Sequence, residues 1–196
     1  MIENNKIPQL IADFKEELKR TSNINIVRKH LLTGECFVFS SGDYFDLRSE
    51  VAHYFKIHPT EVLVVGSAKL GFSISPKKLF LPFRDESDID VAIVSSQLFD
   101  RVWQAAFDYK ITGGYWENLS SFSEYLFRGW IRPDFMPPEH KFEFCREWWK
   151  YFNTLTSSGR YGPFKIRCGL YKSWYFLENY HSHAIKECKN NLEGIK

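Results

Sequence analysis

Two short apolar runs, joined by a segment that carries a Gly-Ser pair and two aspartates, constrain the fold of this chain most. The first run is Val-Leu-Val-Val at 62–65, which has the length and β-branched content of a buried strand. The second run extends from 89 to 94. We expect both runs in one sheet, so the polar residues at their ends should lie where the chain leaves and enters that sheet.

The polar residues at these ends are of two kinds. Gly66 and Ser67 follow the first run and predict a turn whose backbone N–H groups can approach an anion closely. Asp88 and Asp90 stand at the entrance of the second run, and residues two apart in a strand point to the same face. Two like charges held this close repel each other, so their presence needs a reason.

The favoured reason is a site for a nucleoside triphosphate with Mg²⁺ or Mn²⁺. Mg²⁺ takes oxygen ligands and typically combines one or two carboxylates with the phosphates of a substrate. Asp88 and Asp90 are then the metal ligands, and the Gly-Ser turn faces the phosphates. The alternative is a pair of solvated aspartates in a turn before a strand.

The order of these motifs carries a resemblance to a known superfamily. A strand ending in Gly66-Ser67, followed by Ser-Asp-Ile-Asp-Val at 87–91, resembles the signature of the DNA polymerase β-type nucleotidyltransferases. The resemblance covers residues 61–95 and implies that the Gly-Ser turn holds triphosphate oxygens. It also implies that Asp88 and Asp90 are catalytic and bind two Mg²⁺ ions, and that a third carboxylate on a later strand completes the site.

The segment between the two halves of the signature, 69–86, is longer than in the compact members of that superfamily. Its basic side chains are candidate partners for phosphate, and the sequence alone leaves open that they are simply solvated. Lys69 is the candidate nearest the turn, and Ser87 is a further candidate for nucleotide binding beside the aspartates. The other basic residues of the segment are Lys77, Lys78 and Arg84.

The expected third strand, 164–171, has no acidic residue. Its polar positions are Lys165 and Arg167, which are candidates for triphosphate or nucleic-acid binding, or form the solvent face of an edge strand. Three interpretations follow. The third carboxylate comes from elsewhere, with Asp134 as the first candidate catalytic residue and Glu178 as a more distant one; the enzyme works with two carboxylates; or the chain binds nucleotide without turnover.

The resemblance implies a nucleotidyltransferase fold, and the rest of the chain predicts the α/β (α+β) class in a single domain, 1–196. Apolar residues at spacings of three and four indicate helices at 8–20, 24–32, 43–55, 97–109, 115–132, 139–155 and 173–192. The strand-like segment 36–39 extends the predicted sheet core to about 36–95 and 164–171. We expect a short mixed sheet with helices packed on one side, and a helical part at about 97–155 and 173–192.

Composition excludes few functions but indicates a compartment. The net charge of +2 produces no strong global attraction to nucleic acid or membrane. The chain has no secretory leader, no apolar run of membrane length and no C-x-x-C spacing, so a cytoplasmic protein is expected. The aromatic content of 17% is expected mainly in the core, and His181 and His183 are expected at the surface or at an interface.

The function predicted from these features is transfer of a nucleoside monophosphate from an NTP or dNTP to a hydroxyl, with release of pyrophosphate. Small members of the superfamily act on antibiotics, proteins, tRNA ends or oligonucleotide signals. The favoured role is making or extending an oligonucleotide in bacterial antiphage defence. The alternatives are toxin–antitoxin-type nucleotidylation of a protein or tRNA, and a nucleotide-binding pseudoenzyme that scaffolds a partner such as a cognate effector or toxin.

Overall fold

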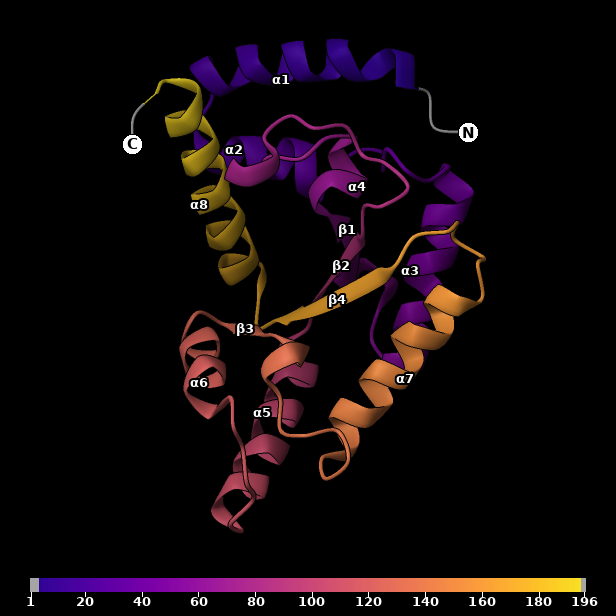
Figure 1. The fold of residues 1–196 in the computed structure, drawn as a ribbon, viewed down its shortest axis with the longest axis vertical. Helices are drawn as coiled ribbons and strands as arrows, with labels where there is room; N and C mark the ends of the chain where they lie inside the picture. Colours follow the sequence, from indigo (N-terminus) through magenta and orange to yellow (C-terminus); the bar gives the residue numbers. More distant parts are fainter. Residues whose placement is uncertain (1–3, 195–196) are drawn as a thin grey trace.

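A computed structural model describes residues 4–194 of the chain as a mixed four-stranded sheet surrounded by helices (Figure 1). The strand order is β1-β2-β4-β3, and the strands are β1 (Val62–Val65), β2 (Ile89–Val94), β3 (Trp130–Ile131) and β4 (Ile166–Tyr171). This confirms the α+β class and the mixed sheet. No helix within 4–194 combines the length and the apolar character that crossing a bilayer requires.

Serine side chains cap the first turns of two of the longer helices. Ser40 and Ser95 each accept a hydrogen bond from the backbone N–H three residues later, which fixes the starts of α3 and α5. The helices are α1 (Ile7–Arg20), α2 (Asn23–Val27), α3 (Ser41–Phe55), α4 (Gly66–Leu70), α5 (Ser96–Ile111), α6 (Leu119–Phe127), α7 (Glu143–Ser157) and α8 (Trp174–Leu192). A π-helical turn, η2 (Arg28–Leu32), and 3-10 turns at Asn4–Lys6, Pro59–Glu61, Pro76–Lys78 and Pro133–Phe135 complete the secondary structure.

The pairing of the strands brings distant parts of the sequence together. Strand β1 runs antiparallel to β2 and places Val65 opposite Asp90. Strand β2 runs parallel to β4 and places the same Asp90 opposite Arg167. The end of β1, the start of β2 and the start of β4 therefore meet at one place in the sheet.

Helices cover both faces of the sheet, so the prediction of helices on one side is wrong. On one face, side chains such as Val64 and Val91 share a large apolar cluster with residues of α3, α5 and α7. On the other face, Leu63, Val65 and Ala92 pack with Leu177 of α8. Figure 1 shows α8, in yellow, on the opposite side of the sheet from α3 and α7.

Three local predictions are also wrong. The segment 33–40 forms a loop rather than a strand, because its backbone N–H groups at Phe37 and Val38 donate to carbonyls of α4. The predicted helix 115–132 is shorter, since α6 ends at Phe127 and the chain then enters β3. His181 is buried, with 7% of its surface exposed, because it follows Leu177 by one helical turn on the buried side of α8.

Candidate functional site

The Gly-Ser pair lies where β1 ends and the short helix α4 begins. Gly66 has a φ of +68°, a conformation that favours glycine. A Cβ atom at this position would stand 3.1 Å from Oδ2 of Asp90. The Asp90 carboxylate therefore lies directly against the turn, and the absence of a side chain at Gly66 makes this approach feasible.

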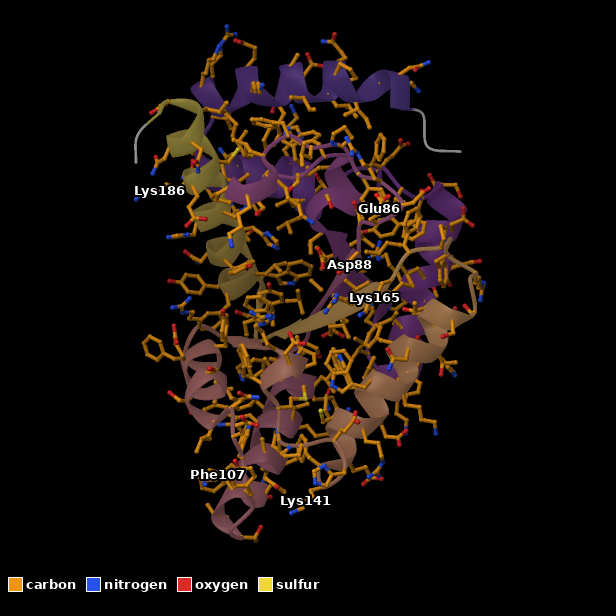
Figure 2. The ribbon with its side chains drawn as sticks, viewed as in Figure 1. Glu86, Asp88, Phe107, Lys141, Lys165 and Lys186 are labelled. Atoms are coloured by element: carbon orange, nitrogen blue, oxygen red, sulfur yellow. The ribbon has the colours of Figure 1, made fainter. Side chains whose placement is uncertain are left out.

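Two acidic and two basic side chains share the same face of the sheet beside this turn. Asp90 lies opposite Arg167 in the pairing of β2 with β4. The backbone N–H of Ile89 donates to the carbonyl of Lys165 at 2.8 Å, so the same pairing extends to the residues before the two strands, Asp88 and Lys165. Because side chains alternate along a strand, Asp88, Asp90, Lys165 and Arg167 point to one side. Figure 2 shows Asp88 and Lys165 near the centre of the molecule, where β2 and β4 begin.

One ion pair joins the acids to the bases. Nε of Arg167 donates to Oδ2 of Asp88 at 2.7 Å, and the two side chains are 44% and 37% exposed. Lys165 is exposed and forms no ion pair with any residue of the described chain. The site therefore offers carboxylate oxygens and cationic groups side by side, with solvent access to both.

The surroundings of the second carboxylate, Asp90, disfavour its charged form. Burial by the surrounding backbone, followed by the negative charge of Asp88, raises the pKa of Asp90 to about 6, and Arg167 opposes this rise. Asp90 still has exposed surface, so it is crowded on the protein side and open on the other. A cation on the open side would stabilise its charged form.

These two carboxylates fit a single hard divalent cation. Mg²⁺ and Mn²⁺ take oxygen ligands and complete their shells with water and phosphate. Between residues 4 and 194, no group of three His, Cys, Asp or Glu side chains is arranged to hold a metal. A third protein carboxylate is therefore absent from this place in the described chain.

The candidates for that third carboxylate are engaged elsewhere. Asp134 lies in the turn after β3 and pairs with Arg132 at 3.0 Å. Glu178 on α8 accepts two hydrogen bonds from Arg28, at 2.7 and 2.9 Å. The structure pairs both candidates with other residues, and within 4–194 neither is grouped with Asp88 and Asp90 in an arrangement that could hold a metal.

Two predicted phosphate ligands, Lys69 and Ser87, form hydrogen bonds with the protein backbone. Lys69 is only 4% exposed, and its Nζ donates to the carbonyl of Gly34 at 2.7 Å. Burial lowers the pKa of Lys69. The hydroxyl of Ser87 accepts a hydrogen bond from the backbone N–H of Arg84 at 3.1 Å and so closes the loop before Asp88. Lys69 is thus held in the interior by the Gly34 carbonyl, whereas Ser87 shapes the loop and keeps its O–H as a donor for a phosphate oxygen.

An aromatic wall next to the charged residues was not predicted. We use this name for Trp130, Tyr171 and Tyr180. Trp130 stacks on Tyr171 with ring centroids 5.3 Å apart and lies 4.6 Å from Tyr180. The indole Nε1 would be 2.6 Å from a Cβ at Gly169, which follows Arg167 on the same face of β4. A glycine inside a predicted strand was the available signal, because it often marks such a close approach.

A broad cleft lies apart from this site. It has a volume of about 1590 Å³ and lies among α1, the loop 33–40 and the turn 160–162. Lys69, Asp85 and Glu86 line it, whereas the turn glycine, the two site aspartates and the two site cations do not. The candidate site is thus an open patch on the sheet face rather than part of this cleft.

The comparisons with known proteins give no relative: no family model matches the sequence, and neither do curated proteins or solved structures. The geometry and chemistry of the site therefore carry the functional proposal.

Proposed function

We propose that this chain is a metal-dependent nucleotidyltransferase that transfers a nucleoside monophosphate from an NTP or dNTP to a hydroxyl. The observation that carries the proposal is the contact between the Gly66 turn and Asp90, with Asp88, Lys165 and Arg167 on the same sheet face. This arrangement collects phosphate-binding groups and carboxylate oxygens in one solvent-accessible place.

The residues of the chain have distinct roles in this proposal. The backbone at Gly66 and Ser67 binds phosphate oxygens, and Lys165 and Arg167 neutralise their charge. Asp88 and Asp90 would hold one Mg²⁺ or Mn²⁺, which when bound stabilises phosphate charge and lowers the pKa of a hydroxyl. These groups act by position and electrostatics, which dominate phosphoryl-transfer catalysis.

The reaction that we propose joins two substrates and releases pyrophosphate. A bond forms between the acceptor oxygen and the α-phosphorus, and the bond from that phosphorus to the bridging oxygen of the β-phosphate breaks. The hydroxyl proton passes to solvent. Fixed positioning of the triphosphate by the turn and the two cations keeps the α-phosphorus within reach of the acceptor.

The aromatic wall favours a nucleotide or oligonucleotide as the acceptor. Tyr180 is 43% exposed, and its ring lies beside Trp130 on the sheet face that carries the carboxylates. Exposed aromatic rings stack on bases with little sequence preference. Synthesis or extension of an oligonucleotide in antiphage defence is the role we favour, and nucleotidylation of a protein or tRNA is the alternative.

The proposal is tested by offering the purified chain each labelled NTP and dNTP with Mg²⁺ or Mn²⁺. Mass spectrometry then detects new phosphodiester products or mass adducts on the protein. We expect a product that disappears in Asp88→Asn and persists in Asp108→Asn, an exposed aspartate on α5 that serves as the matched control. A product that persists unchanged in Asp88→Asn would contradict the proposal.

A nucleotide-binding pseudoenzyme is the second candidate function. The Asp88–Arg167 ion pair supports it, because a carboxylate satisfied by an arginine is less available to a metal. The lack of a third carboxylate within the described residues points the same way. Nucleotide binding without any product, under all the conditions above, is the outcome expected for this second function.

A further inference from the structure

We propose that Arg167 is a built-in counter-ion that limits the carboxylate pair to one divalent cation and supplies the second positive charge toward the triphosphate. This inference rests on the proposed function and concerns how many divalent cations the site holds. It starts from the position of Arg167, which is opposite Asp90 in the β2–β4 register and bonded to Asp88. The guanidinium therefore pairs directly with one carboxylate and is carried by the residue opposite the other in the sheet.

The available ligands support a single ion. Asp88 and Asp90 are the two carboxylates on this face, and no third acidic, His or Cys ligand joins them anywhere in 4–194. A second divalent ion would have to share the same two side chains. It would also face the fixed charge of Arg167, whose Nε is 2.7 Å from Oδ2 of Asp88. Like charges at this range repel strongly where the surroundings are partly desolvated.

The guanidinium has binding capacity left for a phosphate. Only Nε of Arg167 is used in the bond to Asp88, and this is its one ion pair within the described part of the chain. Guanidinium presents further N–H donors in a planar arrangement that matches phosphate oxygens. The free donors and the neighbouring, exposed Lys165 are therefore available to a triphosphate bound on this face of the sheet.

The ion pair is not required for the fold. Both partners are more than one-third exposed, and exposed ion pairs contribute little to stability. Substitutions of Arg167 should therefore yield folded protein, and their effects on metal and nucleotide can be measured directly. This separates a role in the site from a structural role.

The test counts bound Mn²⁺ by electron paramagnetic resonance. The full chain is mixed with an equimolar non-hydrolysable analogue of each NTP in turn, and Mn²⁺ is titrated. We expect one Mn²⁺ per chain in the natural protein. We expect Arg167→Asp, which adds a third carboxylate opposite Asp90, to bind two.

Two further variants separate charge from shape. In the absence of nucleotide, Arg167→Gln should bind Mn²⁺ about tenfold more tightly because the competing cation is gone. The same variant should bind the nucleotide analogue about tenfold more weakly, since a charge-assisted contact is lost. Arg167→Lys should retain the natural Mn²⁺ affinity, and Arg101→Gln, an exposed arginine on α5, should change neither affinity.

Each contrary outcome points to a different failure. Two Mn²⁺ per chain in the natural protein, or an unchanged Mn²⁺ affinity in Arg167→Gln, would overturn the counter-ion role and leave the proposed function intact. No Mn²⁺ binding and no analogue binding in any of these proteins would overturn the proposed function together with this inference.

Discussion

The two faces of the sheet differ: one is covered by an apolar core, and the other carries charged side chains at the start of β2. Along β2, Ile89, Val91 and Ile93 point into the apolar cluster with α3, α5 and α7, and each is almost completely buried. The alternate residues Asp88 and Asp90 point to the other face. On that face, a smaller apolar cluster of Leu63, Val65, Ala92, Val94 and Tyr171 meets Leu177 of α8 and reaches the edge of the charged site at Val65, opposite Asp90.

The difference shows where this fold can accommodate charge. A strand end that leaves the cover of α8 can present carboxylates and cations to solvent, whereas a position one residue away would place them in the core. Because side chains alternate along a strand, a charged residue shifted by one position would point into the apolar core and destabilise the protein.

The largest effect is expected when a charge is moved to the buried face. Val91→Asp places a carboxylate among apolar side chains, which should lower the free energy of unfolding by about 4 kcal/mol or more. The reverse change on the open face, Asp90→Val, should not lower it, because burial raises the pKa of Asp90 and the folded state already disfavours the charged carboxylate at neutral pH. Urea unfolding followed by circular dichroism measures both, and similar losses in the two variants would contradict the distinction between the faces.

His181 should make stability depend on pH. It lies on the buried side of α8, and burial lowers its pKa to about 4, below the ordinary value near 6.5. The folded state therefore disfavours the protonated ring. The free energy of unfolding should therefore be independent of His181 protonation above pH 6.5. It should fall by about 3 kcal/mol as the pH drops from 6.5 to 4, for a pKa shift of this size.

The matched comparison for this pH effect is between two histidines. Nε2 of His181 is buried without a hydrogen-bond partner in the described chain, so His181→Phe loses no polar contact and should flatten the dependence. His183 is exposed on the same helix, and His183→Gln should retain the natural pH profile. Thermal unfolding between pH 4 and 8 measures both, and an unchanged profile in His181→Phe would contradict the account.

A smaller effect is expected at the Gly66 turn. Gly66→Ala imposes a backbone conformation that costs an alanine about 1–2 kcal/mol, and its Cβ would crowd Oδ2 of Asp90 at 3.1 Å. Gly159→Ala is the control, because Gly159 has a similar φ of +64° with no atom within 4 Å of the added Cβ. Both variants should lose stability, but only Gly66→Ala should lose Mn²⁺ affinity. Equal Mn²⁺ affinities in the two variants would contradict a functional contact at the turn.

The smallest effect on stability is expected at the ion pair. Arg167→Gln should change the free energy of unfolding by less than about 1 kcal/mol, because the Arg167–Asp88 pair is exposed. Urea unfolding measures this change. A loss above about 2 kcal/mol would assign the pair a structural role instead.

The sequence could predict the parts of the fold that follow from local periodicity. The runs at 62–65 and 89–94 are strands as expected, and α5 begins at Ser96, one residue before the predicted helix 97–109. The two-residue strand β3 was not predicted, because its existence depends on pairing with β4 rather than on its own pattern. The segment 36–39 was predicted as a strand because its composition is strand-like, but it lies in the loop 33–40, and its N–H groups at Phe37 and Val38 bond to α4.

The same distinction holds for the candidate site. The shared face of Asp88 and Asp90 follows from their spacing, and their closeness to Gly66 follows from the antiparallel pairing of β1 and β2. The Asp88–Arg167 contact, the burial of Lys69 and the position of Trp130 over Gly169 depend on long-range packing. No local pattern contains that information.

The most direct measurement of the central claim is a crystal structure of the chain with Mn²⁺ and a non-hydrolysable nucleoside triphosphate analogue. Anomalous scattering locates the ion without ambiguity. We predict an Mn²⁺ peak between Asp88 and Asp90, with the phosphates against Gly66 and Ser67 and within reach of Lys165. A nucleotide bound instead in the cleft beside α1, with no Mn²⁺ at the two aspartates, would contradict the account.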